Sequence, residues 1–180
     1  MNVFVLLAEG FEECEALVPV DVLRRAGATV CTASLADDTT VSGAHGIKVV
    51  ADVRIDDIDP QSIDCLVLPG GGEGTRRLGE SKKAESLIRH CADNGIYIGA
   101  ICAAPSILGK MGLLAGRRAV CFPEFQEFLA DSIITRSKVE TDDIFITAVG
   151  AGAAYEFAFA LTEALYGSDN AETLKSAMLF

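Results

Sequence analysis

The sequence predicts an α/β fold, a mostly parallel sheet covered by helices on both faces. Short apolar runs of strand length alternate along the chain with longer segments of helical periodicity, which is the pattern of repeated strand–helix–strand units. The runs are nearly free of polar residues, as expected for strands buried on both faces. The chain has 180 residues and is 50% hydrophobic, enough for one domain with a substantial core. We expect that domain to span residues 1–180.

The strands and helices are predicted from these periodicities and from glycine and proline stop signals. Core strands are expected at 2–8, 28–35, 63–68 and 96–101, shorter strands at 119–121, 133–139 and 144–148, and a small hairpin at 41–50. Helices are expected at 12–26, 81–94, 106–111 and 153–165, and a last short helix begins near Asp169. Pro19 is expected to kink or restart the first helix, and the glycine-rich run 69–74 to form a loop.

Charge and composition exclude several classes of partner. The formal net charge of -11 argues against nucleic acid or an anionic membrane as the main partner. The chain starts with a strand-like apolar run that meets Glu9 early, so we expect no signal peptide, no membrane span and a cytoplasmic protein. Its six cysteines are then expected to be reduced. They form no C-x-x-C pair and the chain has two histidines, so we expect no metal site.

Cys102 is the strongest candidate for a reactive residue. It lies between the strand at 96–101 and the helix at 106–111, with Ala100 and Ala104 two positions away on either side and Pro105 opening the helix. Small neighbours at those offsets suit a sharp strand-to-helix turn that exposes a nucleophile. The nearby helix N-terminus is expected to lower the pKa of the thiol. The alternative is a buried structural cysteine, the commoner role for a cysteine taken alone.

Three carboxylates crowd the start of the first helix: Glu12, Glu13 and Glu15. Two of them are expected to be solvated and to complement the helix dipole. The third is expected to point toward Cys102. Two anions in contact repel each other, so the pair would hold one proton between them and titrate together. Such a pair supplies a nucleophile and a proton carrier without a histidine.

The glycine run offers backbone N–H groups to a ligand oxygen. Gly70, Gly71 and Gly72 permit close approach, and together with the N–H of Ala103 they would form an oxyanion hole. A phosphate cradle is the rival interpretation, but the run lacks the ending of a P-loop and no G-x-G-x-x-G motif follows the first strand. A simple turn is the third interpretation.

Two histidines and a second cysteine are weaker candidates for a role in the site. His45 lies in a glycine-flanked turn, where a surface position competes with a role in the site, and His90 lies in a helix, where a structural role is expected. Cys121 ends a strand near the expected elbow and is a candidate redox partner of Cys102.

Three of the predicted strands are followed directly by segments whose residues could bind or react with a ligand. Residues 9–15 follow the first strand, 69–74 the third and Cys102 the fourth. In a parallel sheet, ligands bind beyond the carboxyl ends of the strands. We therefore expect these three segments to meet in one crevice.

With these residues in hand, the chain strongly resembles the ThiJ/PfpI family, in its branch of Parkinson-disease-associated protein deglycases within the class I glutamine-amidotransferase-like superfamily. The resemblance covers nearly the whole length. It rests on AEGFEECEALVPVDVLRRAGATV (8–30), LVLPGGGEG (66–74), AICAAPSIL (100–108) and YEFAFALTEALYG (155–167). It implies a flavodoxin-like three-layer α/β sandwich and a homodimer.

The same resemblance implies roles for individual residues. Cys102 matches the elbow nucleophile and Glu15 the carboxylic acid that touches it, while the oxyanion-site backbone matches Gly70, Gly71 and Ala103. Two further residues match positions near the pocket at the dimer interface of similar proteins, Arg25 and His45.

Three positions depart from the family pattern. Ala103 stands where protease and amidotransferase relatives have histidine after the cysteine, so peptide hydrolysis is not expected. Phe122 stands where many close relatives have histidine before a proline, so no Cys–His pair is expected and Glu15 alone would move the proton. Ala104 replaces a commoner glycine.

The resemblance implies a cysteine-dependent, glutathione-independent glyoxalase (glyoxalase III) or deglycase-type enzyme. It would convert small α-oxoaldehydes such as methylglyoxal to 2-hydroxy acids without a cofactor. The alternatives are an oxidative-stress sensor, in which Cys102 is oxidised to a sulfinate beside protonated Glu15, and a redox-linked holdase chaperone.

Overall fold

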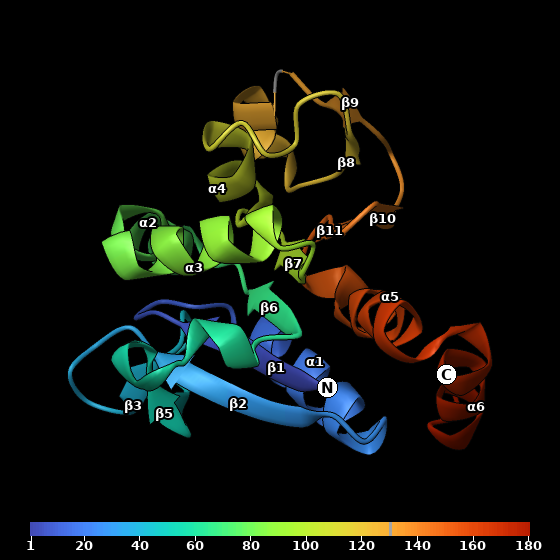
Figure 1. Ribbon diagram of the computed structural model, residues 1–180, viewed down its shortest axis with the longest axis horizontal. Coiled ribbons are helices and arrows are strands. Elements are labelled where there is room, and N and C mark those ends of the chain that lie inside the picture. Colours follow the sequence, from blue (N-terminus) through green and yellow to red (C-terminus); the bar gives the residue numbers. More distant parts are fainter. Residues whose placement is uncertain (130) are drawn as a thin grey trace.

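The computed structural model describes residues 1–129 and 131–180, and a seven-stranded sheet forms its centre (Figure 1). The strand order is β10-β11-β7-β6-β1-β2-β5. All neighbours are parallel except β10 and β11, which pair antiparallel at one edge. The strands are β1 (Asn2–Leu7), β2 (Thr29–Ser34), β5 (Val53–Arg54), β6 (Cys65–Leu68), β7 (Tyr97–Ile101), β10 (Val139–Asp142) and β11 (Phe145–Ala148).

Helices cover both faces of this sheet, so the predicted three-layer α/β sandwich is confirmed. Alternate residues of β1 face opposite layers, because successive side chains of a strand point to opposite sides. Val5 packs in a cluster with residues of α1 and α5, and Leu6 packs in the other cluster with residues of α3 and α4. The helices are α1 (Glu13–Arg25), α2 (Gly72–Glu80), α3 (Lys82–Asp93), α4 (Pro105–Lys110), α5 (Ala154–Tyr166) and α6 (Ser168–Ala177).

Short elements lie outside the central sheet. The predicted hairpin is present as β3 (Thr40–Ser42) and β4 (Lys48–Val50). The strands expected at 119–121 and 133–139 were predicted too long: β8 (Arg118–Ala119) and β9 (Ile133–Ile134) pair only with each other. The single-turn segments are η1 (Ile55–Asp57), η2 (Pro60–Ser62), η3 (Pro123–Leu129) and η4 (Ala151–Ala153).

One further sequence prediction was wrong, and one of the two alternatives given for Pro19 is excluded. The run 69–74 is not wholly a loop, because α2 begins at Gly72 and continues to Glu80. The first helix does not restart at Pro19: α1 continues through this residue, packed against α5. Proline removes only one helical hydrogen bond, and the tertiary packing of the helix outweighs that loss.

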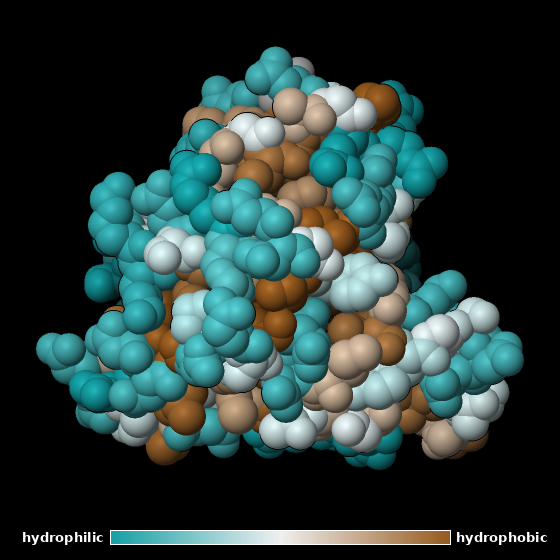
Figure 2. Space-filling model, in the orientation of Figure 1, coloured by the Kyte–Doolittle hydropathy of each residue, from teal (hydrophilic) through white to brown (hydrophobic). Residues whose placement is uncertain are grey.

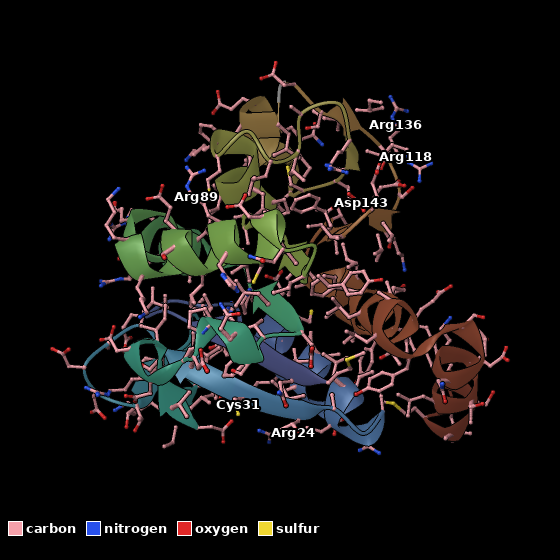
Figure 3. The ribbon with its side chains drawn as sticks, viewed as in Figure 1. Arg24, Cys31, Arg89, Arg118, Arg136 and Asp143 are labelled. Carbon is pink, nitrogen blue, oxygen red and sulfur yellow. The ribbon has the colours of Figure 1, made fainter. Side chains whose placement is uncertain are left out.

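The surface is largely hydrophilic on the face shown in Figure 2. Charged side chains project outward, among them Arg24 beside β2 and Arg118 beside the β8–β10 region (Figure 3). Among the described residues, the helices are too short or too polar to cross a membrane.

Candidate active site

The carboxyl ends of β1, β6 and β7 lie side by side, which confirms the expected meeting of three segments. β6 pairs with β1 on one side and with β7 on the other, all in parallel. After β1 the chain moves outward to β2 and later returns to the opposite side of β1 as β6. The site therefore lies at the point where the strand order reverses, the usual ligand position in sheets of this type.

Cys102 lies on a sharp turn directly after β7. Its φ of 63° is in the left-handed region, which is rare for a residue with a side chain and costs about 1–2 kcal/mol. Two backbone hydrogen bonds hold it there: its N–H donates to Ala148 over 2.9 Å, and its carbonyl accepts from Phe122 over 2.8 Å. The side chain is only partly buried. Strand pairing and the following segment thus hold the thiol in the predicted elbow geometry.

Glu15 is the carboxylate that points inward. It lies in the first turn of α1 and has 0% of its surface exposed. Its Oε2 accepts the N–H of Gly70 over 2.9 Å, and its carboxyl group hydrogen-bonds with the side chain of Cys102. The second oxygen, Oε1, is buried without a hydrogen-bond partner. The site therefore holds a buried acceptor atom that no protein donor occupies.

The backbone N–H groups of the glycine run bond two different side chains, Glu15 and Cys102. The N–H of Gly70 is used by Glu15, so its predicted place in the oxyanion hole is wrong. The N–H groups of Gly71 and Ala103 hydrogen-bond toward the sulfur of Cys102, and their role as oxyanion donors stays a prediction. Gly70 also has no room for a side chain: a Cβ there would overlap Oε2 of Glu15 and approach the Cβ of Cys102 to 2.6 Å.

Burial dominates the electrostatics of the pair. It raises the pKa of Glu15 to about 7, against the lowering effect of hydrogen bonds from Cys102 and Gly70. Burial and repulsion by the Glu15 carboxylate raise the pKa of the Cys102 thiol to about 12, although the N–H groups of Ala103 and Gly71 lower it. The predicted lowering of the thiol pKa is therefore wrong. The proton resides on sulfur while Glu15 is a carboxylate, and the two groups titrate together.

His45 contacts Glu13 and not the Glu15–Cys102 pair. Its Nδ1 lies 2.9 Å from Oε2 of Glu13, whose other oxygen accepts the backbone N–H of His45 over 2.7 Å. Glu13 is therefore buried too, so the expectation that two of the three carboxylates are solvated is wrong. The contact raises the pKa of His45 through hydrogen bonding to Glu13 and the charges of Glu12 and Glu13.

The same residues are the ones that could hold a metal ion in the described parts of the chain. One ligand atom from each of Glu12, Glu13 and His45 lies within 4.8 Å of the others. Glu13 already accepts hydrogen bonds from protein donors there, so its oxygens have partners.

Arg25 is not brought to the site within this chain. It lies at the last residue of α1, about 15 Å along the helix from Glu15. Its side chain is half exposed and pairs with Asp21 over 2.8 Å. Its role at a dimer interface stays a prediction, as does the homodimer.

Phe122 and Gly150 complete the surroundings of the sulfur. A Cβ at Gly150 would lie 3.8 Å from the Cys102 sulfur and 3.6 Å from Cδ2 of Phe122, so Gly150 lies close to both side chains. Phe122 is 40% exposed, while Cys121 is fully buried and its sulfur contacts the Phe122 carbonyl. Gly150 was missed by sequence reasoning. It follows β11, the neighbour of β7, so the rule of adjacent strand ends would have found it.

Comparisons with known proteins agree with this geometry. The family model described as "DJ-1/PfpI family" matches residues 1–164. Protein DJ-1 homolog A of Arabidopsis thaliana is 38% identical over 99% of this chain. The glutathione-independent glyoxalase DJR-1.2 of Caenorhabditis elegans is 32% identical over 94% of this chain and 91% of its own length. Deglycase PH1704 of Pyrococcus horikoshii is 35% identical over 71% of this chain and 75% of its own.

Solved structures give the same fold. The structure of oxidized Toxoplasma gondii DJ-1 superimposes with a TM-score of 0.94 and 34% identity, covering 99% of this chain and 98% of the other. The chain spans less than half the length of the Arabidopsis relative, 46%.

Proposed function

This chain belongs to the DJ-1/PfpI family, and from that premise we propose that it is a cysteine-dependent, glutathione-independent glyoxalase of the glyoxalase III or deglycase type. Its substrates would be small α-oxoaldehydes such as methylglyoxal, and its products 2-hydroxy acids. Two relatives are named a glyoxalase and a deglycase, which supports this class of chemistry.

The observation that supports it best is the buried acid beside the thiol. Glu15 has one oxygen held by Gly70 and one without a partner, and its pKa of about 7 allows it both to accept and to donate a proton near neutral pH. A group with a pKa near the working pH is the most effective acid–base catalyst. No histidine is needed beside Cys102.

The first step forms a hemithioacetal. The Glu15 carboxylate takes the thiol proton as the Cys102 sulfur bonds to the aldehyde carbon. The N–H groups of Gly71 and Ala103 are placed to bond the oxygen that becomes negatively charged, which then takes the proton back from Glu15. The high pKa of the free thiol means that deprotonation accompanies attack.

The second step moves a proton between adjacent carbons. Glu15 removes the hydrogen of the former aldehyde carbon and returns it to the neighbouring carbonyl carbon, while the hydroxyl proton of the first carbon moves to the former ketone oxygen. The result is a 2-hydroxyacyl thioester. Water then hydrolyses the thioester, releasing the 2-hydroxy acid and restoring the thiol. The overall change adds one water to the oxoaldehyde, so no oxidant, reductant or cofactor is consumed.

The neighbouring residues limit the chemistry further. Phe122, whose backbone N–H bonds the Cys102 carbonyl, has an aromatic ring that cannot act as a base, where a histidine would offer a second one. Ala103 likewise offers no base after the cysteine. A peptide bond, whose leaving amine needs a proton donor, is therefore a poor substrate for this site.

Turnover of methylglyoxal without glutathione tests the proposal. Wild-type protein is expected to form lactate, and Cys102→Ser and Glu15→Gln are each expected to lower the rate at least 1000-fold, about 4 kcal/mol in the barrier. Cys91→Ser is the matched control, because Cys91 is buried in the core away from the site. Lactate formation by Cys102→Ser at the wild-type rate would end the proposal.

A second candidate function is peroxide sensing through the same thiol. Its support is the partly exposed sulfur with two backbone donors and a protonatable acid beside it, which suit a sulfinate oxygen. Intact-mass spectrometry after mild peroxide is expected to show two added oxygens that disappear in Cys102→Ser. Equal oxidation of Cys14 or Cys31, which are also partly exposed, would argue against a dedicated sensor.

A further inference from the structure

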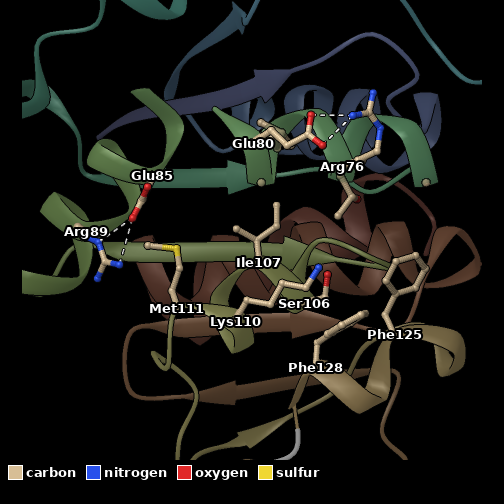
Figure 4. A pocket seen from close by; sticks show the side chains of 14 residues that line it. Arg76, Glu80, Glu85, Arg89, Ser106, Ile107, Lys110, Met111, Phe125 and Phe128 are labelled. Atoms are coloured by element: carbon tan, nitrogen blue, oxygen red, sulfur yellow. Dashed lines mark hydrogen bonds and ion pairs between the residues drawn. The ribbon is translucent and has the colours of Figure 1, made fainter. Parts of the chain in front are cut away.

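A separate cavity lies between α2, α3, α4 and η3, and we name it the α2–α4 cavity. It has a volume of about 570 Å³, within the range of small-molecule sites. Its lining includes Gly72 and Ser106 but neither Cys102 nor Glu15. In Figure 4, Arg76 and Glu80 lie on one side, Phe125 and Phe128 on the opposite side, and Ile107 and Lys110 between them.

The walls are apolar and aromatic. The rings of Phe125 and Phe128 lie 6.4 Å apart and are tilted by 45°, so both contribute to the same wall. Leu78, Ile107 and Met111 line the remaining surface. Such walls favour a flat apolar or aromatic body.

A buried hydroxyl group among these walls has no partner. Thr75 lines the cavity with 5% of its surface exposed, and its Oγ1 is buried without a hydrogen bond. Buried polar atoms are nearly always hydrogen-bonded, because an unpaired one loses its bonds to water. The oxygen is covered in the free protein, so rotation of the Thr75 side chain would have to turn it toward the cavity, where a ligand oxygen would supply the missing partner.

The rim of the cavity is positively charged in an otherwise acidic protein. Three cationic residues and two carboxylates line it. Arg76 pairs with Glu80 over 2.6 Å and Arg89 with Glu85 over 3.1 Å. Lys110 has no carboxylate partner among the described residues, and its Nζ lies 3.9 Å from the centre of the Phe128 ring. The third cation is therefore available to an anion.

We propose that the α2–α4 cavity binds a small aromatic carboxylate that bears a further hydrogen-bonding oxygen. Its ring would pack against Phe125 and Phe128, its carboxylate would pair with Lys110, and its other oxygen would bond with Thr75. The site is independent of the chemistry proposed for Cys102.

Binding of 6-hydroxy-2-naphthoate to the full chain, followed by its fluorescence, tests this site. We expect saturable binding of one molecule per chain with a dissociation constant below about 1 mM. The ammonium analogue, 2-naphthylmethylamine, is expected to bind at least tenfold more weakly, since the free charge at the rim is positive. Lys110→Gln is expected to weaken naphthoate binding about tenfold and to remove the preference for the anion.

Two variants separate this cavity from any other binding site. Gly79 lines the cavity, and a Cβ there meets Cγ1 of Ile107 at an ordinary 3.7 Å, so Gly79→Leu is expected to fold and to fill the space. It should abolish binding. Thr75→Val should weaken 6-hydroxy-2-naphthoate about fivefold and leave 2-naphthoate, which lacks the hydroxyl, unchanged.

Thermal unfolding is measured for each variant to establish that it is folded. Lys110→Gln changes an exposed side chain, so this variant is expected to fold. It can therefore test the proposal even if Gly79→Leu does not fold. No saturable binding below 5 mM, equal binding of the anion and the cation, or unchanged binding by folded Gly79→Leu would overturn the proposal.

Discussion

The Cys102 site and the α2–α4 cavity both adjoin the start of α2, the first through Gly71 and the second through Gly72, and each contains a buried oxygen atom without a partner. In the first site it is Oε1 of Glu15, and in the second it is Oγ1 of Thr75. The first belongs to an ionisable group that contacts a nucleophile, and the second to a neutral hydroxyl among apolar side chains. Under the two proposals, the same structural feature would serve reaction in one place and recognition in the other.

Their charges are arranged in opposite ways. At Cys102 the acid is fully buried and the backbone is in a strained conformation. Burial raises the pKa of both groups, and the charge of Glu15 raises that of the thiol further, whereas the hydrogen bond from Cys102 lowers that of Glu15. At the cavity, Arg76 and Arg89 are paired with carboxylates at the exposed rim, Lys110 has no carboxylate partner among the described residues, and the buried walls are apolar. Changes at the first site should alter pH dependence, whereas changes at the second should alter binding or stability without a pH signature.

The largest expected effect is on stability, in Glu15→Gln. The pKa of Glu15 is raised to about 7 from 4.5, so the folded state binds more protons than the unfolded state between these pH values. Its contribution is fully present below pH 4.5 and is lost as the pH rises through 7. Relative to Glu15→Gln, the wild type should lose about 3 kcal/mol of unfolding free energy between pH 4.5 and 8. Urea unfolding at both pH values measures this.

The same titration should govern the pH dependence of activity. Glu15 must be a carboxylate to accept the proton of Cys102, and its pKa is about 7. The value of kcat/KM for methylglyoxal is expected to be constant above pH 8 and to fall about tenfold per pH unit below pH 7. A profile that stays flat down to pH 5 would mean that Glu15 is not the base.

Two glycine substitutions compare the sites directly. Gly70→Ala forces a Cβ into Glu15 and Cys102, so we expect at least a 100-fold loss of activity and a destabilisation of about 2 kcal/mol. Gly79→Ala adds a methyl group in ordinary van der Waals contact with Ile107 and is expected to stabilise α2 by about 0.5–1 kcal/mol with activity unchanged. Thermal unfolding and lactate formation measure both. Equal effects of the two would remove the distinction between the regions.

The smallest effect is expected for Thr75→Val. The hydroxyl has no partner to lose, so its removal should leave the unfolding free energy unchanged or raise it by up to about 1 kcal/mol. Ser106→Ala, a second hydroxyl at the same cavity, serves as the comparison. A loss above 1 kcal/mol in Thr75→Val would reveal an unrecognised partner of Thr75.

The arrangement of the Cys102 site could be predicted because it follows from chain order. Apolar runs gave β1, β6 and β7, and the segments after adjacent parallel strands necessarily meet at one edge. This placed Glu15, Gly71 and Cys102 together. The helix α2 was not predicted, because its glycines are poor helix formers and packing stabilises them.

The electrostatics could not be predicted, because they depend on burial. The sequence places Cys102 near the start of a helix, which favours a thiolate, but α4 begins only at Pro105 and the buried Glu15 carboxylate opposes ionisation of the thiol. Likewise, the sequence does not reveal that the N–H of Gly70 is used by Glu15, or that Glu13 is buried under His45. These features depend on which donors face which acids.

The pKa of the Glu15 carboxyl group tests the central claim most directly. It is measured by ¹³C NMR of protein with labelled glutamate, and the signal is assigned by its absence in Glu15→Gln. The account predicts one carboxyl group that titrates at about pH 7 and shifts when Cys102 is replaced by serine. Titration near the ordinary value of 4.5 in the wild type, or no response to the serine substitution, would contradict it.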